Sequence, residues 1–175
     1  WSSDVCSSDL MAAMLHDVGK VGVSDTILQK RDPLTPSEMA QVRKHVLLGV
    51  GLFDAVQSEF DRHARDVILY HHARWDGTGY PTTEELATLR RDAPDAAGPV
   101  VEPRGESIPI FARIVALADV FDALVSPRVY KRAWSTREAL DAIAAEAGSH
   151  FDPKLAALLP EVIRRREART QRAVA

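Results

Sequence analysis

Apolar residues recur at helical spacing through most of this 175-residue chain, and no stretch alternates apolar and polar residues with the period of a β-strand. Signals for helix starts lie within the same pattern. The runs Thr35-Pro36-Ser37-Glu38 and Ser135-Thr136-Arg137-Glu138 are capping boxes, and Asp152-Pro153 places a capping side chain before a proline. The chain contains no internal repeat. The sequence therefore predicts an all-α fold, a compact helical bundle without a substantial sheet.

The predicted helices place most of the histidines on a helix or at its end. From the apolar spacing and the start signals, we expect a helix that ends near residue 16 and further helices over 36–53, 61–72, 82–91 and 110–125, after Ser135 and after Asp152. In this assignment His45 lies in the middle of a helix, and His71-His72 lies at the C-terminal end of another. The residues after this pair, Trp75 to Pro81, are rich in turn formers.

Two segments differ in character from this helical domain. Residues 1–10, WSSDVCSSDL, have no initiator Met, no helical period and none of the features of a signal peptide. We interpret them as a foreign leader ahead of a single domain at 11–175. Residues 92–105 combine Pro, Ala, Gly and charged residues without a period, which is typical of a mobile loop.

Charge and hydropathy argue against several classes of function. The 22 Lys and Arg against 25 Asp and Glu give a formal net charge of -3, without the basic excess of a surface that binds nucleic acid polymers. The most apolar stretch, 108–125, is interrupted by Arg113, Asp119 and Asp122, so no membrane span is expected. The single cysteine, Cys6, rules out an internal disulfide framework and fits a reducing compartment, so we expect a cytoplasmic protein.

Six residues with metal-ligating side chains lie on or next to predicted helices, mostly among apolar neighbours: His16, Asp17, His45, His71, His72 and Asp119. Packing of the helices can bring these side chains together. Imidazole and carboxylate groups suit iron, manganese, nickel, cobalt or zinc, and the absence of cysteine ligands argues against structural zinc. Any one of these histidines alone is more simply explained as a hydrogen-bonded core residue. The set as a whole favours a site for one or two divalent metals.

These residues belong to motifs that follow one another in a fixed order: His16-Asp17-Val18-Gly19-Lys20, His45, His71-His72 with Asp76-Gly77-Thr78-Gly79-Tyr80-Pro81, Ala118-Asp119-Val120-Phe121-Asp122-Ala123-Leu124 and Phe151-Asp152-Pro153. The chain from Leu15 to about Leu159 thereby resembles an HD-GYP domain, a branch of the HD phosphohydrolases. The resemblance implies an all-helical fold with a two- or three-metal site. It also implies a phosphodiesterase of bacterial signal transduction that hydrolyses cyclic di-GMP to pGpG, with GMP as a further product left open. The implied cofactors are two divalent ions, first of all iron or manganese, with other transition metals open.

The resemblance also implies roles for single residues. The implied metal ligands are His16, Asp17, His45, His71, His72 and Asp119, with Asp17 as the bridge between the ions. Asp17 and Lys20 are the implied catalytic residues, since Lys20 follows Asp17 by three residues and can bring a cation to a phosphate oxygen. The implied substrate-binding residues are Lys20, Tyr80, Arg128 and Lys131. In the family, the turn Gly79-Tyr80-Pro81 is associated with the substrate rim and with docking of diguanylate cyclase domains.

Several of these roles have a purely structural alternative. A solvated lysine would explain Lys20, a surface charge pair would explain Arg128, and a tight turn would explain Gly79-Tyr80-Pro81. Two further histidines have no implied ligand role. These are His63, which we expect to be exposed on its helix, and His150.

The chain departs from the family pattern around the site. The residues before His16 contain neither the upstream histidine nor the glutamate that the family supplies there, so a third metal is not expected and the domain is interpreted as lacking its N-terminal helices. Ala73 stands where the family often has glutamate, which removes no expected ligand. We expect Asp76 to shape the turn and Asp122 to support the site without binding metal.

Two other functions stay open. One is a catalytically impaired module that binds cyclic di-GMP or docks onto a cyclase domain, and the other is an HD phosphohydrolase for another nucleotide. The second leaves the turn Gly79-Tyr80-Pro81, Arg128 and Lys131 unexplained. A homodimer is also open, because absent helices would expose Met11 and Met14.

Overall fold

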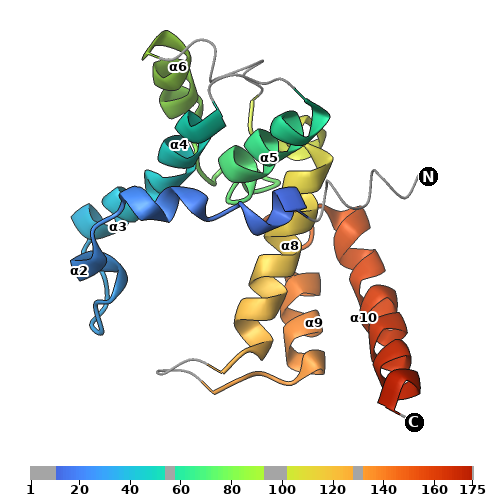
Figure 1. The fold of residues 1–175 in the computed structure, drawn as a ribbon. Helices are drawn as coiled ribbons and strands as arrows, with labels where there is room; N and C mark the ends of the chain where they lie inside the picture. Colours follow the sequence, from blue (N-terminus) through green and yellow to red (C-terminus); the bar gives the residue numbers. More distant parts are fainter. Residues whose placement is uncertain (1–10, 54–57, 93–101, 128–131, 175) are drawn as a thin grey trace.

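The computed structural model describes residues 11–53, 58–92, 102–127 and 132–174, and within these ranges the regular structure is helical apart from one bridge between Ala147 and Phe151. Residues 11–14 are helical. The elements that follow, shown in Figure 1, are η1 (Val18–Gly22), α2 (Asp25–Leu28), α3 (Pro36–Arg43), α4 (His45–Val50), η2 (Gly51–Phe53), α5 (Glu59–Tyr70), α6 (Thr83–Asp92), η3 (Gly105–Ser107), α8 (Ile110–Val125), α9 (Thr136–Ala145) and α10 (Pro153–Val174). The predicted all-α fold is confirmed.

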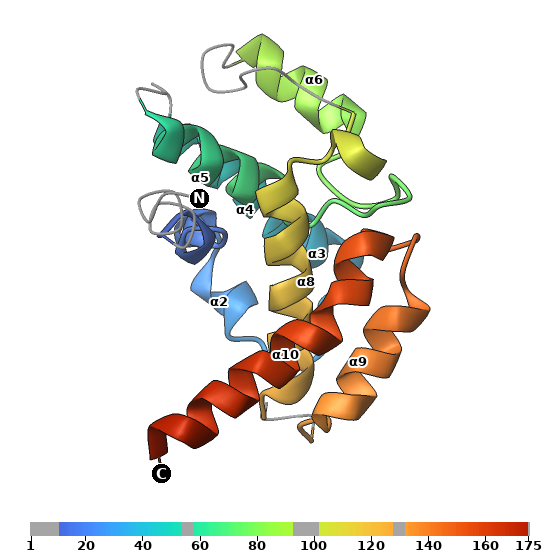
Figure 2. The ribbon, with the colours of Figure 1, turned by 90° about the vertical axis from the view of Figure 1, so that its right-hand side faces the viewer.

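The helix α8 lies between two hydrophobic cores and contributes to both. Ala112, near its start, belongs to the first core together with residues of α4, α5 and α6. Phe121, in its second half, belongs to the second core together with residues of α9 and α10. Figures 1 and 2 show this arrangement, with α4, α5 and α6 around one end of α8 and α9 and α10 beside the other. Because α8 packs against helices on more than one side, its sequence is apolar beyond a single stripe.

Side chains at the helix N-termini determine where the helices begin. Both predicted capping boxes are present, at α3 and at α9. Ser58 forms a third capping box with Asp61, so α5 begins at Glu59, earlier than predicted. At the start of α10, Asp152 Oδ1 accepts the backbone N–H of Lys154 at 2.8 Å.

The helix predicted over 36–53 is divided in three. α3 ends at Arg43, α4 starts at His45, and the 3-10 helix η2 completes the segment. His45 is therefore the first residue of α4 and does not lie in the middle of a helix. The reason is burial, because α3 has no buried residue whereas α4 buries His45, Val46, Gly49 and Val50. The second half of the predicted helix is thus part of the core, whereas the first half lies at the surface.

The prediction of an exposed His63 is wrong. This residue is buried, with 8% of its surface exposed, and its ring centroid lies 4.5 Å from that of Phe111 on α8. The helical period identified an apolar face on α5, but it could not show that α8 covers this face widely enough to include His63.

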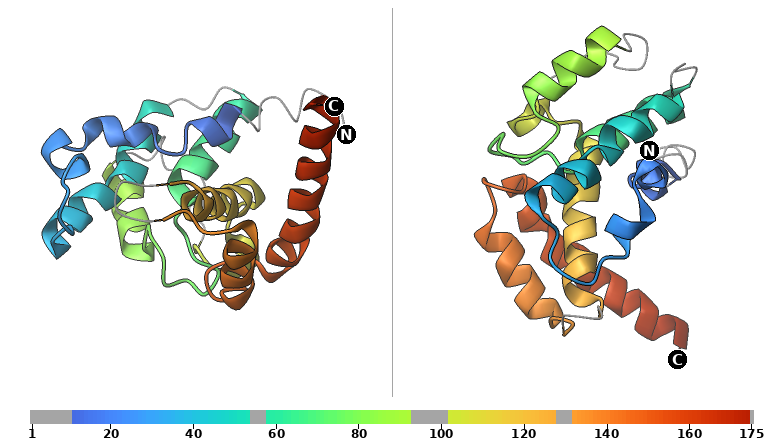
Figure 3. Two further views of the ribbon diagram at one scale, coloured as in Figure 1. Left: turned by 90° about the horizontal axis from the view of Figure 1, so that it is seen from below. Right: turned by 90° about the vertical axis from the view of Figure 1, so that its left-hand side faces the viewer.

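Some predictions lie outside the described residues. These are the leader at 1–10, most of the predicted loop at 92–105, and the substrate-binding roles of Arg128 and Lys131. In Figures 2 and 3 the C-terminal half of α10 extends away from the other helices, and residues 164–172 are exposed. Among the described residues, no helix combines the length and the apolar character that crossing a membrane requires.

Candidate metal centre

Two stretches of backbone approach closely where η1 meets α4. A Cβ atom on Gly19 would collide with the carbonyl oxygen of His45 and would lie 2.5 Å from the backbone nitrogen of Gly49. Only glycine fits at this position. The close contact holds the turn that carries His16 and Asp17 beside the start of α4.

Four side chains from three segments converge here. Asp17 comes from the turn before η1, His45 from the start of α4, and His71 and His72 from the end of α5, and their donor atoms all lie within 4.8 Å of one another. Asp17 Oδ1 lies 3.4 Å from His45 Nε2 and 3.9 Å from His71 Nε2, and the two Nε2 atoms are 3.3 Å apart. The structure thus brings together four of the six predicted ligands as one tight group.

Backbone hydrogen bonds orient two of the imidazoles. His45 Nδ1 lies 2.7 Å from the carbonyl oxygen of Val42, and His71 Nδ1 lies 3.0 Å from that of Ile68. A carbonyl only accepts hydrogen bonds, so each Nδ1 carries the proton and donates it, which leaves the Nε2 lone pair directed toward Asp17. Metal-binding histidines are commonly oriented in this way.

The surroundings favour the protonation states that a metal ligand needs. Burial lowers the pKa of His45, lowers the pKa of His71 well below its usual range, and lowers the pKa of His72 to about 3. Burial opposes ionisation of Asp17, but hydrogen bonds with His16 and Lys20 outweigh it and lower the pKa of that carboxyl. Neutral imidazoles and an ionised carboxylate are the forms that bind metal.

The donor set fits a divalent transition metal. Asp17 Oδ1 is buried, and among the described residues it has no hydrogen-bond partner. A buried anionic oxygen without a partner is costly, and the Nε2 atoms that face it carry lone pairs and no proton. A cation within the group would satisfy the carboxylate and the imidazoles at once, and one oxygen with three nitrogens suits iron, manganese or zinc.

The two remaining predicted ligands lie at the margin of this group. His16 Nε2 is 3.4 Å from Asp17 Oδ2, and the hydrogen bond with Asp17 raises the pKa of His16. Asp119 on α8 is half-buried and contributes to the same rise in the pKa of His16 through its charge. Lys20 donates to Asp17 Oδ2, so its ammonium lies beside the group of four, as its spacing from Asp17 suggested.

The turn after the histidine pair places Tyr80 in contact with the centre. The ring of Tyr80 stacks on that of His72 with centroids 4.6 Å apart and an interplanar angle of 27°, and burial raises the pKa of its hydroxyl. The backbone N–H of Tyr80 donates to the carbonyl oxygen of His72 at 3.3 Å. Asp76 shapes the turn as expected, because its Oδ1 accepts the backbone N–H of Thr78 at 2.9 Å.

Two contacts of arginine side chains escaped the sequence analysis. The guanidinium carbon of Arg43, the last residue of α3, lies 5.1 Å from the ring centroid of Tyr80. Arg113 forms a buried ion pair with Asp152 and lies 5.8 Å from the ring of Trp75. A charged residue within the most apolar helix could have suggested such a partner, but no local pattern indicates the contact between Arg43 and Tyr80.

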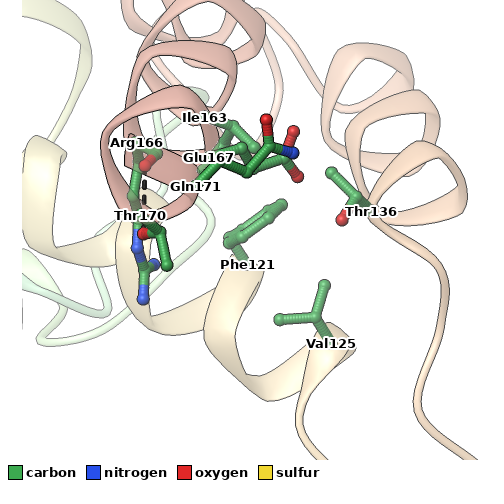
Figure 4. A pocket seen from close by; sticks show the side chains of 8 residues that line it. All are labelled: Phe121, Val125, Thr136, Ile163, Arg166, Glu167, Thr170 and Gln171. Atoms are coloured by element: carbon green, nitrogen blue, oxygen red, sulfur yellow. Dashed lines mark hydrogen bonds between the residues drawn. The ribbon is translucent and has the colours of Figure 1, made fainter. Parts of the chain in front are cut away.

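Other candidates are not part of the ligand group. Asp122 is exposed, and in the described part of the chain its carboxylate makes no hydrogen bond. The ring of His150 stacks on that of Phe151 with centroids 4.2 Å apart. A groove of about 480 Å³ lies between α8, α9 and α10, with Phe121 and Ile163 in its wall (Figure 4). None of the predicted site residues lines this groove.

Comparison with known proteins identifies relatives. An HD domain family model matches residues 9–124, and a second HD domain model matches residues 98–155. The cyclic di-GMP phosphodiesterase response regulator RpfG of Xanthomonas campestris pv. campestris is 42% identical over 144 residues, which cover 82% of this chain and 33% of that protein. The 3'3'-cGAMP-specific phosphodiesterase 2 of Vibrio cholerae is 38% identical over 150 residues, which cover 86% of this chain and 25% of that protein.

The chain thus spans about a quarter to a third of the length of these curated relatives. The fold also resembles the crystal structure of the cyclic GMP-AMP-specific phosphodiesterase V-cGAP3 of V. cholerae, with a TM-score of 0.55 and 19% identity over 94% of this chain and 39% of that chain. The family model over residues 9–124 contains the whole group of Asp17, His45, His71 and His72. The chain therefore belongs to the HD domain family.

Proposed function

We propose that this chain is the catalytic domain of a metal-dependent phosphodiesterase that hydrolyses a cyclic dinucleotide. The observation that carries the proposal is the group of Asp17, His45, His71 and His72, in which neutral imidazoles direct Nε2 atoms toward an ionised carboxylate. The relatives in X. campestris and V. cholerae are phosphodiesterases for cyclic di-GMP and 3'3'-cGAMP, which supports the substrate class.

In this proposal the metal ligands are His16, Asp17, His45, His71, His72 and Asp119, which would hold two divalent ions, iron or manganese. Such ions lower the pKa of water and neutralise charge that develops on the phosphate oxygens. Residues of the chain set the protonation and the orientation of the ligands before an ion binds. Buried imidazoles stay neutral, and the backbone carbonyls behind His45 and His71 hold the rings in place.

Two further residues would act on the substrate. Lys20, half-exposed beside Asp17, supplies a positive charge next to a bound phosphodiester. Tyr80 presents an aromatic ring at the edge of the centre, where a base or a ribose can pack. The roles of Arg128 and Lys131, docking of a diguanylate cyclase domain through Gly79-Tyr80-Pro81, and a homodimer stay predictions.

We further propose cyclic di-GMP as the substrate and pGpG as the product. Several relatives carry the name cyclic di-GMP phosphodiesterase, among them a protein of Pseudomonas aeruginosa that is 39% identical over 146 residues. The competing substrate is 3'3'-cGAMP, which differs in one base.

The test compares the chain with its variants Asp17→Asn and Asp122→Asn. Metal content is measured after loading with Mn²⁺ or Fe²⁺, and hydrolysis of cyclic di-GMP and 3'3'-cGAMP is followed by separation of the linear products. Asp17→Asn is expected to lose metal and activity together, because Asp17 Oδ1 faces two ligand nitrogens. Asp122→Asn is the matched control, since its side chain is exposed, and it is expected to keep both within about threefold. Binding of cyclic di-GMP without hydrolysis would instead support a binding module, and preference for 3'3'-cGAMP would reassign the substrate.

A further inference from the structure

Arg43 lies at the edge of the metal centre on a short, fixed connection. It is the last residue of α3, two residues before His45. The carbonyl oxygen of Val42, which joins Arg43 to the preceding residue, accepts the hydrogen bond from His45 Nδ1. The backbone of Arg43 is therefore tied to a proposed metal ligand, and its position relative to the centre is set by local structure.

The side chain of Arg43 packs over Tyr80, whose ring in turn stacks on a proposed metal ligand. Its guanidinium carbon lies 5.1 Å from the ring centroid of Tyr80, and the ring of Tyr80 stacks on that of His72. The centroids of His45 and Tyr80 are 6.3 Å apart, so the aromatic ring lies next to two of the proposed ligands. A guanidinium over an aromatic face keeps its planar orientation at little cost in conformational freedom.

The charge of Arg43 is available to a ligand. The residue is exposed, and within the described ranges no carboxylate forms an ion pair with it. Lys20, Arg74 and Arg113, by contrast, pair with Asp17, Glu146 and Asp152. Arg43 differs from these three cations in having no carboxylate partner within the described ranges.

A cyclic dinucleotide contains two phosphodiester groups in one small ring. Only one of them can occupy the metal centre during hydrolysis, and the other keeps its negative charge. An arginine whose guanidinium is fixed near the centre, but outside the ligand group, can bind such a phosphate through two parallel N–H donors.

We propose that Arg43 is a specificity residue that binds the non-reacting phosphate of the cyclic dinucleotide, with Tyr80 holding its guanidinium in place. This inference rests on the proposed phosphodiesterase function and adds a residue to it. It predicts that Arg43 contributes to recognition of a substrate with two phosphodiesters and contributes little for a substrate with one.

The experiment uses the metal-loaded chain and two substrates, cyclic di-GMP and bis(4-nitrophenyl) phosphate, which has a single phosphodiester. Arg43→Met keeps an apolar stem over Tyr80 and removes the charge. It is expected to raise KM for cyclic di-GMP by about 10- to 100-fold, the range for loss of a hydrogen bond to a charged group, with a much smaller change in kcat. The loss in kcat/KM for bis(4-nitrophenyl) phosphate is expected to be several times smaller.

Two controls complete the design. Arg43→Lys keeps the charge without the paired donors and is expected to restore part of the lost affinity. Arg137→Met removes a side chain on α9 that is 92% exposed, and it is expected to change neither substrate's kinetics. Equal losses for both substrates, or unchanged KM for cyclic di-GMP in Arg43→Met, would overturn the inference alone. Hydrolysis of bis(4-nitrophenyl) phosphate by the wild-type chain with none of any cyclic dinucleotide would overturn the proposed function and this inference with it.

Discussion

Gly19, next to the metal centre, leaves no room for a side chain. Gly19 lies against the backbone of α4, and a Cβ atom there would displace the segment that carries Asp17 away from His45. The donor atoms of the centre lie within 4.8 Å of one another, with 3.4 Å between Asp17 Oδ1 and His45 Nε2. A shift of a fraction of an ångström at Gly19 would therefore change the geometry of the ligand group.

We expect Gly19→Ala to lower the affinity for Mn²⁺ by about 10- to 100-fold, comparable to the loss of a group that orients a ligand. Isothermal titration with Mn²⁺ measures the effect. Gly51→Ala is the matched control, because a Cβ atom on Gly51 meets no atom within 4 Å and its φ of -60° suits alanine. Equal affinities in the two variants would show that the contact between η1 and α4 does not position Asp17.

At the scale of elements, the buried ion pair between Arg113 and Asp152 joins α8 to the start of α10. The side chain of Asp152 is 2% exposed and that of Arg113 is 14% exposed. The same segment also holds the turn after the histidine pair, because the backbone N–H of Trp75 donates to the carbonyl oxygen of His150 at 3.0 Å. The segment before α10 is thus tied to α8 through the ion pair and to the turn that carries Tyr80 through this backbone hydrogen bond.

Removal of one partner of this ion pair is expected to lower the free energy of unfolding more than removal of both. Arg113→Met leaves the buried carboxylate of Asp152 without its partner, and we expect it to lower the free energy of unfolding by about 3–5 kcal/mol. In the double variant Arg113→Met/Asp152→Asn, the side-chain amide at position 152 carries no charge, and its oxygen can still accept the N–H of Lys154. The decrease in the free energy of unfolding should therefore be smaller. Urea denaturation followed by circular dichroism gives both values. A double variant less stable than Arg113→Met would contradict this account of the pair.

At the scale of the whole molecule, the centre lies where separate parts of the fold meet. The turn before η1, the start of α4 and the end of α5 supply the group of four donors, and α8 brings Asp119 near them. Their histidines are buried by the surrounding helices and not by their own segments, so their protonation depends on the folded state as a whole.

Folding of the metal-free protein is expected to weaken in acid. The pKa of His72 is about 3 in the folded state against 6.5 for an ordinary histidine, and burial lowers the pKa of His45 and His71 as well. Between these values the unfolded chain binds more protons than the folded chain, so stability is complete above about pH 6.5 and falls as the pH decreases toward 3. The raised pKa of His16 acts in the opposite direction but concerns one residue.

The measurement is the urea midpoint of chelator-treated protein at a series of pH values. The urea midpoint of the wild type should decrease steadily below about pH 6.5. The midpoint of His72→Asn should decrease less steeply, because this variant lacks one of the buried histidines. A pH profile that is the same in wild type and His72→Asn would show that His72 does not contribute to the acid lability.

Features that depend on neighbours along the chain can be predicted from the sequence. Helix spacing and the capping residues Thr35 and Ser135 predicted α3 and α9 at their observed starts, and the apolar run predicted α8 at Ile110–Val125, because helices and their caps are formed by residues within a few positions of one another. The residue types and their order also indicated a histidine and carboxylate centre.

Which side chains meet and which surfaces are covered could not be predicted in this way, because both depend on how the helices pack. The division of the predicted helix at Lys44, the burial of His63 against Phe111, and the position of Arg43 over Tyr80 each depend on contacts between segments far apart in the sequence. Local periodicity shows that a helix has an apolar face, but the width of that face and its partner are set by the packing of the whole chain. The protonation of His45, His71 and His72 follows from the same packing, since burial by other helices is what keeps them neutral.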